Sequence, residues 1–493
     1  MPKPNYILFF PDEMRATSVS CYGNPTVKMP AFDRLASEGT LFEHCIVQNP
    51  VCSPSRCSLM TGWYVHTAGH RSLWHLLRPH EPSLLRYLKN DGYDIRWYGK
   101  NDLYSQAYLD EILDNVADLR QGKAPATARP SGKVHGNAPT VGPEDPLYDS
   151  FLVPPIPEMG EEILLDPCVA QALDFLDAHK PGDAPFFLYL PTTMPHPVYN
   201  ALERFHEMYG AGEVASQLID PESLSGEPAL APLIRLYRRV AQWDPKVLSK
   251  IYAVYLGMNS YVDYLLGLLM DALDRTGLSD STVLMVTSDH GDWAGNKGLV
   301  EKWPNAMDDD LVRVPLLMKG PGIRAGRRVA GQAALFDLMP TVLEMSGIAC
   351  KHTHFARSLV PELSGARDDR ERPVFCEGGY DAHDPWCFES LPRGTGLVET
   401  RHVYTPKVVQ QKEYPESVCR TTMIRTLTHK LILRTGGDNE LYDLVKDPGE
   451  TRNVCRDPAY AQVARDLRER LLMWYIETSD VTPWNDDPRG FAP

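Results

Sequence analysis

Acidic and imidazole side chains directly follow two apolar runs that lie far apart in the sequence. Four residues occupy these positions, two after each run: Asp12 and Glu13, and Asp289 and His290. In an open parallel sheet, ligands bind beyond the carboxyl ends of the strands, so we expect both pairs at one edge. Three carboxylates and one imidazole suit Ca²⁺, Mg²⁺ or Mn²⁺. The alternative is that Asp12 and Asp289 only cap the turns that follow, but the matched placement favours a metal site.

A cysteine precedes a short helix-like stretch in the segment 52–62, CSPSRCSLMTG. Pro54 suits the first turn of a helix, which would put Cys52 or Ser53 at the N-cap. Free backbone N–H groups and the helix dipole attract an anion there, and Arg56 can direct its guanidinium to the same place. Position 52 is therefore where a nucleophile would face an anionic group. The alternative is a buried cysteine that only fills space.

The same cysteine also belongs to a pattern that is superficially like a zinc knuckle. The four residues have the spacing C-x₄-C-x₈-H-x₃-H: Cys52, Cys57, His66 and His70. The interval between the second cysteine and the first histidine is shorter than in a zinc finger. We therefore treat zinc binding as a minor alternative.

Three further polar side chains have positions that suggest a role. Lys100 and His196 each follow an apolar run, as the metal-ligand candidates do, and Lys302 lies a short distance beyond Asp289. An imidazole titrates near neutrality, so His196 is a candidate proton donor. A single Lys or His is more often an exposed residue without a specific role. The strand-end position makes this alternative weaker for Lys100 and His196.

These side chains need a scaffold that brings strand ends together. Five runs are rich in aromatic and β-branched residues and predict buried strands: 6–10, 94–99, 185–191, 282–288 and 314–320. Three segments with helical spacing end at glycine: 30–39, 81–92 and 249–277. The alternation predicts an α/β fold with a mixed, mostly parallel sheet flanked by helices.

The last part of the chain has a different pattern. Four short strands without intervening helices are expected, followed by a helix: 373–379, 401–406, 421–426, 429–435, and the helix 459–477. We predict a catalytic domain over 1–365 and a smaller C-terminal α+β subdomain, an antiparallel sheet plus a helix, over 366–493. The segment 121–157 is rich in Pro, Gly and Ala and predicts a surface excursion or lid.

Composition narrows the function classes. The 493 residues include 43% hydrophobic and 23% charged residues, which is ordinary for a soluble globular protein. The formal net charge of −15 argues against nucleic acid as a partner. No apolar run is long enough for a signal peptide or a membrane span, and the ten cysteines show no framework spacing. We expect a cytoplasmic protein with reduced thiols, although a chain that has lost its signal would look the same.

The motifs resemble those of the sulfatase family. CSPSR followed by Thr-Gly matches the family signature C-x-P-S-R, and further landmarks occur in family order: PNYILFFPDE, the GK after a strand, MPHP, SDHGD, VRVPLLMKGPG, LMPTVLEMSGI and ELYDLVKDPGETRNV. The likeness covers nearly the whole chain. It implies an alkaline-phosphatase-like α/β fold with a small C-terminal subdomain, and a sulfuric ester hydrolase.

The resemblance also implies a cofactor and a set of roles. Cys52 would be oxidised by a formylglycine-generating enzyme to formylglycine (3-oxoalanine), whose hydrate attacks sulfur and later releases sulfate. The metal ligands would be Cys52 with the four strand-end residues Asp12, Glu13, Asp289 and His290. We expect Ca²⁺, with Mn²⁺ or Mg²⁺ as alternatives. Arg56 would support the hydrate, Lys100 and Lys302 would neutralise sulfate, and His196 would contact the ester oxygen.

Some positions depart from the family pattern. Glu13 stands where many members have Asp or Gln, Asp289-His290 where many have Asp-Asn, and Asp102 where a His is usual, for which His66 and His70 are possible substitutes. Asp-His also occurs in phosphonate monoester hydrolases, so a phosphodiesterase or phosphonate monoester hydrolase is the main alternative, and an unmodified sulfate-ester-binding relative is another.

The expected partner is a sulfated saccharide or other small organic sulfate. The rim of its pocket is expected in the segments 70–82 and 121–157. Four residues of the first segment could read a sugar and its carboxylate, or could belong to a solvated loop: Arg71, Trp74, His75 and Arg78.

Overall fold

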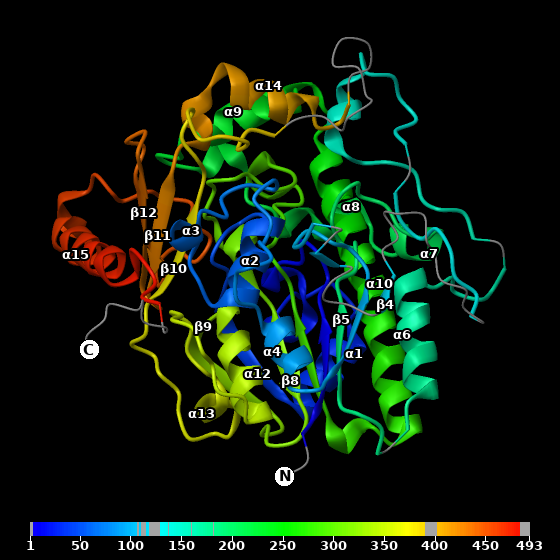
Figure 1. The fold of residues 1–493 in the computed structure, drawn as a ribbon. Helices are drawn as coiled ribbons and strands as arrows, with labels where there is room; N and C mark the ends of the chain where they lie inside the picture. The colour runs from blue at the N-terminus through cyan, green and yellow to red at the C-terminus, as the bar shows by residue number, and fades with distance from the viewer. Residues whose placement is uncertain are drawn as a thin grey trace, which may run out of the picture.

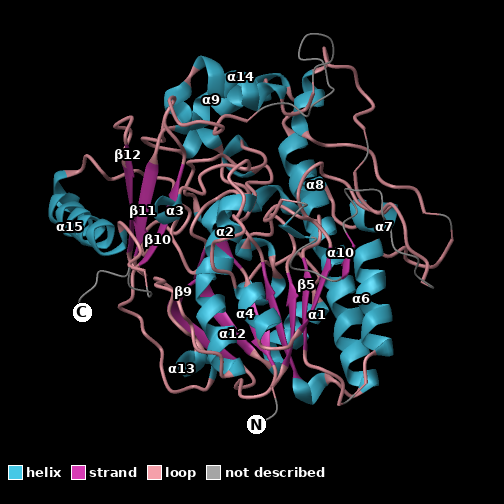
Figure 2. Ribbon diagram, viewed as in Figure 1, coloured by secondary structure: helices cyan, strands magenta, loops and turns pink. Residues whose placement is uncertain are grey.

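The computed structural model describes residues 3–105, 108–109, 115–117, 129–136, 138–158, 160–180, 182–389 and 402–483. A large central sheet has helices on both faces, and a smaller sheet with the helix α15 stands at one side of it (Figures 1 and 2).

The central sheet contains nine strands in the described part of the chain, in the order β4-β3-β5-β1-β6-β8-β2-β7, with β9 also paired to β2. Their bounds are β1 (Asn5–Phe9), β2 (Thr40–Ile46), β3 (Asp94–Tyr98), β4 (Asn115–Ala117), β5 (Phe186–Leu190), β6 (Thr282–Thr287), β7 (Arg313–Val314), β8 (Leu316–Lys319) and β9 (Arg327–Ala334). The five strands from β4 to β6 run parallel, whereas β8 is antiparallel to β6 and to β2. The sheet is therefore mixed and mostly parallel, as the sequence predicts.

Helices cover both faces of this sheet. The helices are α1 (Pro30–Glu38), α2 (Cys52–Thr61), α3 (Val65–Ala68), α4 (Leu84–Asn90), α6 (Pro167–Ala178), α7 (Glu203–His206), α8 (Ala211–Val214), α9 (Leu230–Tyr237), α10 (Lys246–Thr276), α11 (Asp309–Val312), α12 (Leu338–Ser346), α13 (Val360–Leu363), α14 (Thr405–Glu413) and α15 (Ala461–Thr478). No helix in the described residues combines the length and the apolar character that crossing a bilayer requires.

Alternation along β1 divides the interior into two cores. Ile7 and Phe9 pack with apolar residues of α1, α6 and α10 on one face. Tyr6 and Leu8 point to the other face, where α4 and α12 pack. Because side chains of a strand alternate between faces, a continuous apolar run serves both cores at once. The strand is thereby fixed along its length, and the residues that follow it are held at a defined position.

A four-stranded antiparallel sheet forms most of the C-terminal part: β10 (Val374–Gly378), β11 (Thr421–Arg425), β12 (His429–Arg434) and β13 (Glu440–Asp443). The strand predicted over 401–406 is wrong for its described residues. Thr405 begins the helix α14, and Pro406 occupies its first turn. Proline suits that position because its missing N–H needs no partner there. The proposed domain boundary at residue 366 stays a prediction.

The sequence missed several elements. β2, β9 and β13 were not predicted, because β2 and β9 carry polar residues between their apolar ones and β13 has only four residues. The predicted helices are confirmed as α1, α4 and α10, which begin and end within a few residues of the expected bounds. Of the predicted excursion 121–157, residues 121–128 and 137 lie outside the described part.

Candidate active site

The predicted strand-end residues do converge at one edge of the sheet. Four adjacent strands, β3, β5, β1 and β6, end there and lead into Lys100, His196, Asp12 and Asp289. At two of these strand ends, a glycine lies in close contact with the backbone of a neighbouring segment. A Cβ on Gly99 would lie 2.1 Å from the carbonyl oxygen of Pro191, and one on Gly291 would lie 2.0 Å from that of Asp310. Only glycine fits at these two places.

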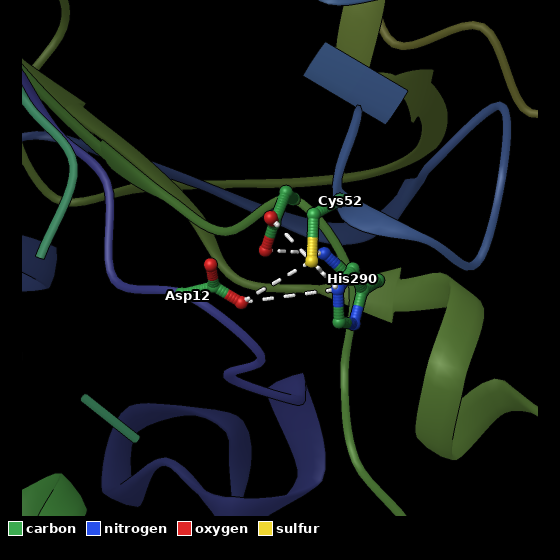
Figure 3. Close-up of side chains that lie close together, drawn as sticks. Asp12, Cys52 and His290 are labelled. Atoms are coloured by element: carbon green, nitrogen blue, oxygen red, sulfur yellow. Dashed lines mark hydrogen bonds and ion pairs between the residues drawn. The ribbon is translucent and has the colours of Figure 1, made fainter. Parts of the chain in front are cut away.

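Four potential ligands gather at the start of α2. Asp12, Cys52, Asp289 and His290 are all buried, and one ligand atom of each lies within 4.8 Å of the others. The Cys52 Sγ lies 3.1 Å from His290 Nε2 and 3.8 Å from Asp12 Oδ1, as Figure 3 shows. His290 Nδ1 lies 2.9 Å from the Gly291 carbonyl oxygen. If Nδ1 donates its proton to this oxygen, Nε2 carries a free lone pair that faces the centre of the group. This donor set fits a divalent cation.

Arg56 joins the two carboxylates of this group. Its Nη2 donates to Asp12 Oδ2 at 2.8 Å and to Asp289 Oδ2 at 2.8 Å, and its Nε donates to Asp289 Oδ2 at 2.9 Å. The guanidinium is fully buried and lies over the ring of Phe10. Arg56 therefore neutralises the two carboxylates and fixes their positions beside Cys52.

Glu13 lies on the other side of Asp12. It forms a second group with Asp12 and His196, and its Oε2 lies 2.8 Å from Lys302 Nζ and 3.3 Å from His196 Nε2. Its Oε1 is buried and has no hydrogen-bond partner. Glu13 has φ of 70°, a conformation that costs free energy for a residue with a long side chain. An unpartnered buried carboxylate oxygen next to Asp12 also fits a cation.

Two lysines are the remaining charged residues of the predicted site. Lys100 Nζ donates to Asp12 Oδ2, and it lies 3.6 Å from the sulfur of Cys52. It also pairs with Asp102 at 2.8 Å, so a carboxylate lies beside this ammonium group. Lys302 Nζ lies 3.1 Å from His196 Nε2. The two ammonium groups therefore approach Cys52 and His196 from different sides.

The buried charges shift each other's pKa. Burial alone would raise the pKa of Asp12, but Lys100 and Arg56 bring it well below its usual range. Burial raises the pKa of Glu13 despite Lys302. The pKa of the Cys52 thiol is raised by burial and by Asp12, so this thiol is a poor nucleophile as it stands. Burial, Lys302 and Lys100 lower the pKa of His196.

Other predictions need correction. Val51, not Cys52 or Ser53, is the N-cap of α2, because the Val51 carbonyl already accepts the first helical bond, from Ser55. The alternative of a zinc knuckle is wrong, because its two histidines contact glutamates and not the two cysteines. His66 Nδ1 lies 2.7 Å from Glu377, and His70 Nε2 lies 3.0 Å from Glu81, which also removes both as substitutes near Asp102.

The structure adds residues that the sequence did not single out. His135, from the predicted excursion, lies 3.0 Å from the Val198 carbonyl oxygen. Burial lowers its pKa to about 4, and the charges of Asp12 and Lys100 also act on it. No strand-end position or motif marked it, so only the folded chain identifies it. Glu301 is a second such residue, since it contacts Lys302 at 3.2 Å.

Comparison with known structures and sequences identifies the class of protein. The phosphonate monoester hydrolase of Agrobacterium radiobacter superposes with a TM-score of 0.72 at 23% identity, over 97% of this chain and 96% of the other. The multifunctional alkaline phosphatase superfamily protein PehA of Trinickia caryophylli is 26% identical over 545 residues, covering 100% of this chain and 99% of its own length. The fold and the site therefore define an alkaline-phosphatase-like hydrolase.

The family follows from a more specific match. The sulfatase family model matches residues 4–348, and the chain belongs to the sulfatase family. The Delta 4,5-hexuronate-2-O-sulfatase of Bacteroides thetaiotaomicron is 23% identical over 496 residues, covering 97% of this chain and 89% of its own length. The protein is a sulfuric ester hydrolase.

Proposed function

We propose that the enzyme hydrolyses the sulfate ester of a sugar or another small organic sulfate, using one divalent metal and a formylglycine formed from Cys52. The observation that carries this proposal is the convergence of Asp12, Cys52, Asp289 and His290 around one point. Three buried cations, Arg56, Lys100 and Lys302, surround that point. Such a site complements the charge of a sulfate group and of the transition state for its transfer.

The groups that the site would hold have defined places. Asp12, Asp289 and His290 would bind the metal together with the modified residue 52, and Glu13 Oε1 is a further ligand candidate. We expect Ca²⁺ because carboxylate oxygens predominate, with Mn²⁺ or Mg²⁺ as alternatives. When bound, the metal supplies Lewis-acid stabilisation, and the hydrated aldehyde at position 52 supplies the attacking oxygen.

The other side chains of the site would bind the sulfate group and hold the metal ligands. Lys100 and Lys302 would bind and orient the sulfate oxygens, because one ammonium group lies next to Cys52 and the other lies next to His196. Arg56 neutralises Asp12 and Asp289 and holds them in place. In the overall reaction, the bond between sulfur and the bridging oxygen breaks, the alcohol leaves with a proton, and water supplies the oxygen of the released sulfate.

His196 is placed to deliver the proton to the alcohol. Its Nδ1 lies 2.6 Å from the Pro197 carbonyl oxygen, which fixes the ring and leaves Nε2 toward the site. Its lowered pKa keeps the resting ring neutral. The negative charge of a bound sulfate ester counteracts Lys100 and Lys302, which favours the protonated ring when substrate is present.

A phosphodiesterase or phosphonate monoester hydrolase is the second candidate function. The Asp289-His290 pair supports it, as does the similarity to PehA and to the phosphonate monoester hydrolase fold. Tetrahedral phosphorus esters are stabilised by the same metal and cations. The CSPSR segment and Lys100 favour the sulfate ester.

The experiment that separates the two is a paired assay on modified protein in Ca²⁺ and in Mn²⁺. It compares kcat/KM for an aryl sulfate with kcat/KM for an aryl phosphonate, and Cys52→Ala serves as the control for contaminating activity. We expect the sulfate to be preferred and the variant to be inactive. A clear preference for the phosphorus ester would overturn the proposal.

Maturation and location complete the proposal. The residues after Cys52 match those that direct a formylglycine-generating enzyme in the family, so this enzyme is the proposed partner during maturation. We further propose a cytoplasmic location. Cell fractionation of the native host, with an antibody against the protein, tests the location directly.

A further inference from the structure

Two tryptophans differ from the others in the described residues because they are exposed. Trp74 is 54% exposed and Trp386 is 79% exposed. The buried ones are Trp63, Trp97, Trp243, Trp293, Trp303 and Trp474. Exposure of an indole loses the free energy that its burial would provide, so two exposed indoles call for an explanation.

One hydroxyl group joins the two loops that carry these side chains. The Ser72 Oγ donates to the carbonyl oxygen of Trp386 at 2.9 Å and accepts from the backbone N–H of Trp74 at 3.3 Å. His75 Nδ1 lies 3.2 Å from the same Oγ. The backbones of Trp74 and Trp386 are therefore fixed relative to each other, although they come from distant parts of the sequence.

The second loop is held in place and is locally strained. Trp386 has φ of 56°, a left-handed conformation that is unusual for a bulky residue and costs free energy. Two residues before it, Asp384 accepts two hydrogen bonds from Arg420 Nη2, at 2.7 and 2.9 Å. The anchored loop thus maintains a conformation that leaves the Trp386 indole in solvent.

The pair is continuous with the catalytic site. The Leu73 carbonyl oxygen, one residue before Trp74, accepts a hydrogen bond of 3.5 Å from Ser53 Oγ. Ser53 directly follows Cys52 at the start of α2. The loop that carries Trp74 therefore lies against the first turn of α2, next to residue 52.

We propose that Trp74 and Trp386 form a stacking site for a pyranose ring of the substrate, which makes the substrate a sulfated saccharide. This inference rests on the proposed function and names its substrate class. The C–H groups on the face of a pyranose are apolar and pack on an indole, while its hydroxyl groups stay in water. Because the backbones of both residues are fixed, binding restricts only the rotation of each indole side chain.

The test uses the full-length, modified enzyme with two kinds of sulfate ester. One is 4-nitrophenyl sulfate, and the other is a panel of 2-O-sulfated unsaturated uronyl disaccharides. Trp74→Ala and Trp386→Ala are compared with Trp74→Phe and Trp386→Phe, which keep a stacking surface. Leu472→Ala removes a side chain that is 60% exposed on α15 and serves as the matched control.

We expect each Trp→Ala variant to raise KM for the best disaccharide by about five- to tenfold with little change in kcat. The ratio of kcat/KM for the disaccharide to kcat/KM for the aryl sulfate falls accordingly. The Phe variants recover most of the loss, and Leu472→Ala equals the wild type. Equal losses on both esters, or no loss, would overturn the stacking site.

Calorimetric binding of the same disaccharides to the Cys52→Ala variant separates this inference from the proposed function. If the enzyme turns over no sulfate ester, the proposed function fails, yet weaker binding after Trp→Ala substitution still supports the stacking site. Absence of disaccharide binding overturns it. A change of oligomeric state in sedimentation, with unchanged disaccharide kinetics, also overturns it and assigns the two indoles to a contact between copies of the chain.

Discussion

Replacement of Arg56 by Ala tests how the buried charges of the site are balanced. The guanidinium donates three hydrogen bonds of 2.8 to 2.9 Å to Asp12 and Asp289, and all three side chains are fully buried. In the variant, two carboxylates lose their shared cation, and Lys100 is left to neutralise Asp12. We therefore expect the folded state of the metal-free protein to lose stability.

The size of the expected loss in unfolding free energy follows from the burial of Arg56 and its two carboxylate partners. Removing one partner of a buried ion pair leaves an uncompensated charge and costs about 3–5 kcal/mol. Arg56→Lys keeps a positive charge but cannot form the forked contact, so its loss is about 1–3 kcal/mol. Arg34 provides the matched control, because it also contacts three carboxylates, Glu38, Asp271 and Asp274, at the surface. Arg34→Ala should cost about 1 kcal/mol or less.

The assay is urea unfolding in the presence of a chelator, followed by tryptophan fluorescence. The expected order of unfolding free energies is wild type and Arg34→Ala highest, Arg56→Lys intermediate, and Arg56→Ala lowest. If Arg56→Ala were as stable as Arg34→Ala, the assigned role of Arg56 in neutralising the two carboxylates would be wrong.

Three further predictions concern metal, pH and packing. Chelation should lower Tm and Ca²⁺ should restore it, with a gain of about 2.7 kcal/mol in unfolding free energy at 100 times Kd. Asp289→Asn should abolish this response in a thermal-shift titration. Burial raises the pKa of Asp263 to about 7, so the folded state holds a proton that the unfolded state releases. The unfolding free energy should therefore fall by up to about 4 kcal/mol from pH 4 to 7. Asp263→Asn should flatten this pH dependence in urea unfolding. A Cβ on Gly257 would lie 1.9 Å from the Phe205 carbonyl oxygen, so Gly257→Ala should lower the urea midpoint, with a loss of at least about 1 kcal/mol in unfolding free energy. A Tm unaffected by chelator, a pH dependence unchanged in Asp263→Asn, or an unchanged midpoint would contradict these three in turn.

Strand ends were the most informative feature of the sequence. Parallel strands buried on both faces give continuous apolar runs, and the polar residues just after them must meet at one edge, which placed Asp12, Lys100, His196 and Asp289 together. Lys302 has no such position, and its nearness to Asp289 in the sequence and the resemblance to the sulfatase family were what pointed to it.

Features that depend on tertiary contacts were not accessible in this way. The side chain of Glu13 turns toward Lys302 and His196, because its backbone adopts φ of 70°. His135 reaches the site from a segment without regular spacing. The pairing of the Trp74 and Trp386 loops involves the Ser72 hydroxyl group, whose partner lies more than 300 residues away, and no local pattern encodes it.

The most direct test of the proposed mechanism is to relate activity to the chemical state of residue 52. The protein is produced with and without a formylglycine-generating enzyme, and mass spectrometry of the peptide carrying Cys52 gives the converted fraction in each preparation. The proposal predicts aryl sulfatase activity in proportion to that fraction, with none in Cys52→Ala. Full activity in a preparation with an intact Cys52 thiol would contradict it.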